Sequence, residues 1–151
     1  MEDKMSNEAS ITNSLLEFMV LSHTKMVRPL NESFKPVLSP LQTNVILLLK
    51  IYGSMSMTQL TDKLMMPKQQ MTQIAHHLEE IGFVARNIDR NDRRRIIVDL
   101  TAKANDYIDE NVAAYMGKSI TESKNLTARE KKQLSTTLDT LNTLLSKITV
   151  E

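Results

Sequence analysis

The sequence has no cysteine and no tryptophan, and aromatic residues make up 4% of its 151 residues. Without thiols it can form no disulfide framework, no thiolate zinc site and no cysteine redox switch, which fits a reducing compartment. A surface that stacks single-stranded bases is also disfavoured, because such surfaces need exposed rings at intervals. The longest strongly apolar run, residues 45–49, is far shorter than a membrane span, and the first residues do not resemble a secretory signal. We expect a cytoplasmic protein without a membrane partner.

A large excess of charge is absent as well, since 19 Lys+Arg against 18 Asp+Glu give a net charge of +1. Binding to a polyanion must therefore come from a local basic patch and not from the field of the whole molecule. Only three glycines and four prolines are present, which indicates long helices. With 41% hydrophobic and 25% charged residues, the composition is that of a globular protein, and the length predicts a single domain over residues 1–151.

Three helix-start signatures are present. Ser39/Gln42, Ser56/Gln59 and Thr127/Glu130 each place Gln or Glu three residues after Ser or Thr, so that each side chain can accept from the other residue's backbone N–H. These pairs predict helices over residues 39–53, 56–63 and 127–148. In the first of these helices, Leu41, Val45, Leu48 and Tyr52 recur at helical spacing until Gly53.

Apolar spacing predicts three further helices, and β-branched runs predict one hairpin. The helices cover residues 8–30, 67–81 and 101–119, and the first either ends near Arg28-Pro29 or continues past it with a kink. The β-branched runs 83–88 and 95–100 flank a charged turn and form the hairpin. The expected order is four helices, the hairpin and two helices, a mainly α fold.

The helices at 56–63 and 67–81 are joined by a short turn at Met65-Met66, which predicts a helix-turn-helix. On the second helix one face is apolar and is expected to be buried; it consists of Met71, Ile74, Ala75, Leu78 and Ile81. The opposite face is polar and mostly uncharged; it consists of Lys68, Gln69, Thr72, Gln73 and His76, with Gln70 and His77 at its margin.

This polar face suits the major groove of DNA. Gln can pair with adenine through two hydrogen bonds, Thr can contact a thymine methyl group, and Lys can reach guanine or a phosphate. Carboxylates, which phosphates would repel, are absent from the first two turns of the helix. An ordinary solvated helix has a similar surface, so this face alone does not separate the two interpretations.

The hairpin favours DNA binding, because residues 86–95 contain five arginines and two aspartates, a net charge of +3. Exposed arginines at a hairpin tip can enter the minor groove, where a narrow A·T tract concentrates negative potential. A helix-turn-helix followed by a basic hairpin is a winged helix-turn-helix. We expect its wing to contact DNA through Arg86, Arg90, Arg93, Arg94 and Arg95.

Residues 41–101 resemble the MarR family of bacterial winged-helix regulators. The matching positions are Met71-Thr72, Leu78-Glu79, Ile81-Gly82-Phe83-Val84-Ala85-Arg86, Asp89, Asp92-Arg93-Arg94 and Leu100-Thr101. The resemblance implies that Arg94 enters the minor groove, that Asp92 holds the shape of the wing, and that terminal helices intertwine to form a homodimer. It also implies a small effector, often an aromatic anion, bound between the terminal helices and the DNA-binding lobe; His23 and Arg28 are the residues considered for that pocket.

These expectations divide the chain into a DNA-binding lobe at residues 39–100 and a helical dimerisation region at residues 8–30 with 105–148. The last predicted helix carries leucines at alternating steps of four and three, a seam that fits either packing within the chain or a subunit interface. The residues predicted for dimerisation are Ile11, Leu15, Phe18, Leu138, Leu141, Leu145 and Ile148.

No catalytic residue, metal ligand set or cofactor is predicted. Adjacent His76 and His77 point about 100° apart on a helix, so they cannot chelate one metal together. The sequence also contains no nucleophile elbow and no phosphate-binding glycine loop. The ten methionines suit flexible core packing.

The leading hypothesis is a homodimeric repressor that binds double-stranded DNA at a pseudo-palindromic operator. The recognition helix would read bases through Lys68, Gln69, Gln70, Thr72, Gln73 and His76. The alternative is a winged helix used as a protein-interaction module without a specific DNA site. That alternative predicts a monomer or a heterocomplex. Its binding to the partner should not show the salt dependence that is typical of binding to a polyanion.

Overall fold

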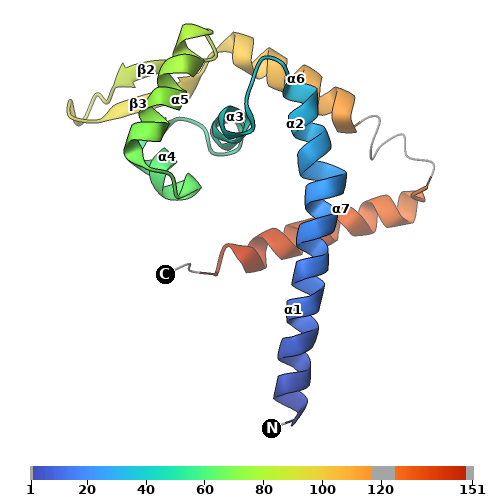
Figure 1. Cartoon of the computed structure of the whole chain (residues 1–151). Coiled ribbons are helices and arrows are strands. Elements are labelled where there is room, and N and C mark those ends of the chain that lie inside the picture. The colour runs from blue at the N-terminus through green and yellow to red at the C-terminus, as the bar shows by residue number, and fades with distance from the viewer. Residues whose placement is uncertain (1, 117–124, 149–151) are drawn as a thin grey trace. The chain divides into compact units, whose positions relative to one another are not determined.

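The computed structural model describes residues 2–116 and 125–148, with side chains described for residues 10–115 and 125–148 (Figure 1). The chain divides into two compact units, residues 1–112 and 113–151. The elements of the described ranges are α1 (Glu2–Ser22), η1 (His23–Val27), α2 (Arg28–Phe34), α3 (Pro40–Tyr52), β1 (Met55–Ser56), α4 (Met57–Leu64), α5 (Lys68–Glu80), β2 (Val84–Ile88), β3 (Ile96–Leu100), α6 (Ala102–Met116) and α7 (Ala128–Leu145).

The N-terminal helical segment does not end at Arg28-Pro29. Helix α1 runs into a five-residue π-helical stretch, η1, and α2 then carries Pro29 in its first turn. The N–H of Arg28 bonds to the carbonyl of His23, five residues earlier, so the backbone widens directly before the proline. A proline cannot donate a backbone hydrogen bond, and a wider turn accommodates that loss without ending the helix. Of the two expectations, continuation past the proline is confirmed.

The three predicted capping boxes are present at the starts of α3, α4 and α7. At α3, for example, the Ser39 backbone N–H donates to Gln42 Oε1 at 2.8 Å, and the Ser39 hydroxyl accepts from the Gln42 backbone N–H. At α7, hydrogen bonds from the Thr127 hydroxyl and backbone hold the pKa of Glu130 below its ordinary value. These local contacts fix three helix starts before any tertiary packing is considered.

The residues that recur at helical spacing on α3 do not all lie in the core. Val45 is buried, but Leu41 is 40% exposed and Tyr52 is 58% exposed. The core-facing side chains include Ile46 and Leu49 instead. The helix is apolar on every side over residues 45–49, so spacing alone could not define its rotation.

The predicted hairpin is confirmed as β2 and β3, and a third strand, β1, completes an antiparallel sheet in the order β1-β3-β2. Strand β1 was missed because it has two residues, too few to show alternation. Met55 pairs with Val98, and both are buried. This pairing attaches the base of the hairpin to the start of α4.

Helix α5 buries Met71, Ile74, Ala75 and Leu78, as its apolar face predicted, while Ile81 is half-buried. The core around these residues extends to α3, to Leu60 of α4, and to Val84 and Val98 of the sheet. Helix α5 therefore lies fixed against three neighbouring elements, with its polar face outward.

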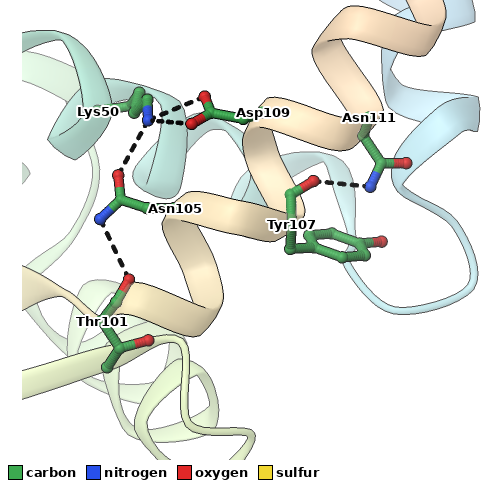
Figure 2. Close-up of polar contacts among 6 residues, drawn as sticks. All are labelled: Lys50, Thr101, Asn105, Tyr107, Asp109 and Asn111. Carbon is green, nitrogen blue, oxygen red and sulfur yellow. Dashed lines mark hydrogen bonds and ion pairs between the residues drawn. The ribbon is translucent and has the colours of Figure 1, made fainter.

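Helix α6 joins the lobe through a set of polar contacts (Figure 2). Lys50 Nζ of α3 donates to Asn105 Oδ1 at 3.0 Å and forms an ion pair with Asp109 at 2.9 Å. Asn105 Nδ2 donates to the Thr101 carbonyl at 3.2 Å. These contacts hold the first half of α6 against α3.

Tyr107 links α6 to the end of α2. Its hydroxyl donates to the Phe34 carbonyl at 3.0 Å, and its ring lies 5.7 Å from Phe34 and 5.0 Å from Phe83, between centroids. Burial raises the pKa of the Tyr107 hydroxyl. One aromatic side chain thus contacts both the N-terminal helical segment and the base of the wing.

The second unit contains the described part of α7, which begins at Ala128 and ends at Leu145, three residues before the predicted end. Along it Leu134, Leu138 and Leu141 are half-buried, whereas Leu145 is 40% exposed and Ile148 is 64% exposed. The predicted helix at 101–119 corresponds to α6, and residues 117–119 lie outside the described residues. Across the described ranges, no helix combines the length and apolar character needed to cross a membrane.

We predict that Tyr107→Phe destabilises the protein by about 1 kcal/mol or less, because a single hydrogen bond is lost while the ring contacts remain. The cost is limited because the Phe34 carbonyl also accepts from the Leu38 N–H at 3.1 Å. Urea unfolding measures the change. Tyr52→Phe, at an exposed ring, is the matched control and should leave the free energy of unfolding unchanged; equal values for both variants would contradict the assigned contact.

Candidate nucleic-acid interface

The turn between α4 and α5 depends on Met65, which adopts a left-handed conformation with φ 47° and ψ 43°. Its side chain is 73% exposed, and the following N–H, of Met66, bonds to the Thr61 carbonyl at 3.0 Å. A left-handed residue ends a helix abruptly and reverses the chain. Pro67 then forms the N-cap of α5, without a side-chain hydrogen bond. The helix-turn-helix prediction is therefore realised with a tight, αL-terminated turn.

The polar residues predicted on the recognition helix α5 are all exposed; they are Lys68, Gln69, Gln70, Thr72, Gln73 and His76. The Thr72 hydroxyl donates to the Lys68 carbonyl at 2.9 Å, which uses its proton within the helix. At the far end His76 and His77 both lie near the Glu80 carboxylate, at 3.5 and 3.6 Å. The first two turns thus present amide and ammonium groups without a carboxylate.

The tip of the wing is ordered by its two aspartates. Asp89 Oδ1 accepts from the Asn91 N–H at 2.8 Å, and Asp92 Oδ1 accepts from the Arg94 N–H at 3.0 Å. Backbone hydrogen bonds between Asp89 and Arg95 and between Arg95 and Asp92 close the turn. Asp92 therefore acts on the backbone that carries Arg94.

Four wing arginines are exposed, and they form no ion pair among the described residues: Arg90, Arg93, Arg94 and Arg95. Arg86 differs from them. It is half-buried on β2, and its guanidinium donates from Nε to Glu79 Oε2 of α5 at 2.8 Å, with a second contact from Nη2. The hydrogen bond and charge of Arg86 hold the pKa of Glu79 below its ordinary value.

The pair Glu79–Arg86 was not foreseen, although both residues were noted in the sequence. They are seven residues apart, on either side of the helix end and the glycine turn at Gly82, so neither helical nor strand spacing brings them together. Arg86 therefore connects the recognition helix to the wing, and part of its charge is neutralised by Glu79.

Recognition helix and wing meet in a hollow of about 200 Å³. Four cationic side chains line it, Lys68 from α5 and three arginines of the hairpin, and no carboxylate does. The lining residues are Ser56, Met57, Thr58, Lys68, Thr72, Arg86, Arg94, Arg95 and Ile96. Of the predicted DNA-binding residues, the structure brings Lys68, Thr72, Arg86, Arg94 and Arg95 together here, and leaves Gln69, Gln70, Gln73, His76, Arg90, Asp92 and Arg93 outside it.

Helix α1 exposes many apolar side chains. Ile11 is 60% exposed, Leu15 is 45% exposed and Phe18 is 37% exposed, and Leu16, Met19 and Val20 are more exposed than Leu15. Large exposed apolar patches commonly mark contact surfaces. His23 lines a shallow hollow on α1 and η1 together with Met19 and Val27, whereas Arg28 does not line it. Within residues 10–115 and 125–148, no group of three His, Asp or Glu side chains is placed to hold a metal ion.

A helix-turn-helix whose recognition helix lies beside a basic hairpin defines the class of winged helix-turn-helix proteins. Residues 38–96 match the family model of the MarR family. No curated protein has a matching sequence. Many solved structures do match in fold.

Three of these structures illustrate the likeness. Wild-type MarR from E. coli, in its apo form, is 24% identical, with a TM-score of 0.67 over 84% of this chain and 95% of that one. The transcriptional regulator PA4135 is 27% identical, with a TM-score of 0.67 over 91% and 97%. The transcriptional regulator BldR from Sulfolobus solfataricus is 21% identical, with a TM-score of 0.64 over 96% and 99%. The likeness to the MarR family rests on residues 38–96, and these three solved proteins share the fold over most of the chain.

We predict that Glu79→Gln destabilises the protein at neutral pH and that the effect disappears in acid. The pKa of Glu79 is lower in the folded protein than its ordinary value of 4.5, so its stabilising contribution is complete above about pH 5.5 and is lost as the pH falls through the lower, folded-state pKa. Denaturant unfolding of both proteins across this range measures the difference.

Arg86→Gln in both backgrounds completes a double-mutant cycle for this pair. If Arg86 is the partner, Glu79→Gln should have little further effect once Arg86 is replaced. A pH-independent difference, or equal effects with and without Arg86, would show that the ion pair does not contribute as described.

Proposed function

We propose that this protein is a homodimeric transcriptional regulator, acting as a repressor, that binds a pseudo-palindromic site in double-stranded DNA. The observation that carries the proposal is the hollow between α5 and the wing, which four cationic side chains line without a carboxylate. Phosphate contacts of such groups supply most of the affinity of a protein for duplex DNA. The neighbouring uncharged face of α5 supplies groups that can distinguish base pairs.

In the proposed complex, α5 enters the major groove. Gln69, Gln70 and Gln73 are exposed and can each offer the paired donor and acceptor that adenine accepts, which favours an A·T-rich site. Lys68 and Thr72, at the edge of the hollow, lie between this helix face and the wing. The arginines of the wing tip, Arg94 in particular, then reach the adjacent minor groove.

The dimer is proposed to form through the terminal helices. The exposed apolar side chains of α1 would be buried by a second copy, together with the half-buried and exposed leucines of α7. The proposed contact residues are Ile11, Leu15, Phe18, Leu138, Leu141, Leu145 and Ile148. A two-fold dimer places two recognition helices on half-sites about 10 bp apart.

An effector is proposed to act on the spacing of the two recognition helices. A small anionic or aromatic ligand that favours one spacing would shift the dimer between binding-competent and incompetent populations. The hollow at His23 supports a ligand contact on the N-terminal segment, and His23 is the residue retained for it. The protein is proposed to act in the cytoplasm, without catalytic activity and without a cofactor.

Selection of bound duplexes from a random library tests the proposal, with wild type and Arg94→Ala run in parallel at moderate salt. Wild type should enrich a pseudo-palindrome. Arg94→Ala should weaken binding to it by roughly tenfold, and should reduce the slope of log affinity against log salt by about one, because fewer counterions are released.

The matched control is Arg129→Ala, an exposed arginine on α7, in the other compact unit. It should leave both the affinity and the salt slope unchanged. A folded wild-type dimer that enriches no duplex, with or without candidate effectors, would favour a protein-interaction module over a DNA-binding regulator.

The dimer is tested by Leu15→Glu. Placing a carboxylate within the exposed apolar face of α1 should weaken association by at least roughly tenfold, because an unpaired charge would be buried at the interface. Sedimentation at micromolar concentration measures the monomer–dimer equilibrium. Val37→Glu is the control, since Val37 is 44% exposed against 45% for Leu15. If both variants self-associate as strongly as wild type does, the interface lies elsewhere.

A further inference from the structure

The wing carries two exposed isoleucines that its electrostatic role does not use. Ile88 ends β2 and is 67% exposed, and Ile96 begins β3 and is 44% exposed. The two are direct partners in the antiparallel register. A single exposed apolar side chain is ordinary on a protein surface, but here two large ones lie opposite each other on a short, arginine-rich hairpin.

The register places this pair on the side of the sheet that faces the recognition helix. Alternate residues of a strand share a face, so Ile88 lies on the same face as Arg86, and its partner Ile96 lies there too. Arg86 reaches Glu79 of α5 from this face. Ile96 itself lines the hollow shared with Lys68 and Thr72 of α5. In Figure 1 the hairpin extends beyond α5. Ile88 is the last residue of β2 and therefore lies nearer the wing tip than Arg86.

The charges around the pair define what can cover it. Ile96 shares the hollow with Lys68 from one side and with Arg94 and Arg95 from the other, without a lining carboxylate. Ile88 lines a separate hollow at the wing tip, where Arg90 is accompanied by Asp89 and Asp99. The cationic environment is therefore that of Ile96. A ligand that contacts both sides at once must carry negative charge on either side of an apolar surface. The backbone of duplex DNA has this pattern, since phosphates alternate with deoxyribose rings whose C–H groups are apolar. A second wing would bring its own net charge of +3 against this one and be repelled.

We propose that Ile88 and Ile96 form an apolar contact surface that packs against deoxyribose at the edge of the minor groove of bound DNA. The inference rests on the proposed DNA-binding function and adds to it two residues that carry no charge. Their contribution comes from apolar area removed from water, so it differs from that of the arginines in one measurable respect. Losing it lowers affinity without changing the number of counterions released.

The test uses Ile88→Thr, Ile96→Thr and the double variant in the full chain. Threonine is also β-branched and keeps the strand preference of isoleucine, while it removes most of the apolar contact. Affinity for the duplex enriched by wild type is measured at several salt concentrations. Each single variant should bind roughly three- to tenfold more weakly, with the salt slope of wild type.

Ile51→Thr is the matched control, because Ile51 is 71% exposed but lies on α3, which contributes no residue to the hollow. It should bind within roughly twofold of wild type. Ile88→Val, which keeps most of the apolar surface, should lose less affinity than Ile88→Thr. Because Ile88→Val introduces no polar group, it still tests the apolar contact if a threonine variant folds poorly.

Either of two binding results would overturn the inference alone: unchanged affinity in the isoleucine variants while Arg94→Ala is impaired, or a lower affinity with a reduced salt slope. Sedimentation of the isoleucine variants without DNA gives a further result. If their oligomeric state differs from that of wild type, a second copy covers the pair, and the inference is overturned as well. If wild type itself enriches no duplex, the proposed function and this inference are overturned together. This result differs from the others because it is seen in wild type and not only in the variants.

Discussion

The burial of one face of α5 determines the orientation of the whole DNA-binding lobe. Met71 and Leu78 are completely buried against α3, α4 and the sheet, so the helix cannot rotate without exposing them. Truncating one large buried apolar side chain to alanine typically lowers the free energy of unfolding by several kcal/mol. The outward direction of Lys68 and Thr72 follows from that constraint, because side chains on opposite faces of a helix are fixed relative to each other.

The junction between α5 and the wing is held by the start of α6. Lys103 Nζ donates to the Ile81 carbonyl at 2.7 Å, and the Thr101 hydroxyl donates to the Gly82 carbonyl at 2.8 Å. Gly82 has φ +74°, a conformation that L side chains rarely adopt, so the chain reverses there with little strain. The same helix contacts Phe34 through Tyr107. One helix therefore connects the end of the N-terminal segment to the point where the recognition helix becomes the wing, and a movement of either end must displace α6 or break these contacts.

Local chemistry made much of this fold predictable. The capping boxes depend on residues three positions apart, and the buried face of α5 and the β2–β3 hairpin depend on regular patterns along one continuous stretch of sequence. Each was placed correctly. The buried face of α3 was not predictable, because Val45 to Leu49 offer no polar side to define a face. The remaining surprises are contacts between segments: the pairing of Met55 with Val98, and the ion pair of Glu79 with Arg86. Neither has a signature in spacing, because both depend on how helix, turn and strand are placed in three dimensions.

The distribution of charge constrains how such a lobe can find and hold a polyanion. Residues 86–95 carry a net charge of +3 in a chain whose total is +1, so the rest of the molecule is net negative by two. At physiological salt the field of the wing is screened within about 8 Å, and the remaining surface gives no general attraction to phosphate. We expect attraction to be strongest at the wing and the adjacent end of α5, where Lys68 lies. Under the proposed function, a protein built in this way gains most from contacts made at close range. The glutamines of α5 would then discriminate between duplexes, and the isoleucines of the hairpin would add affinity without adding charge.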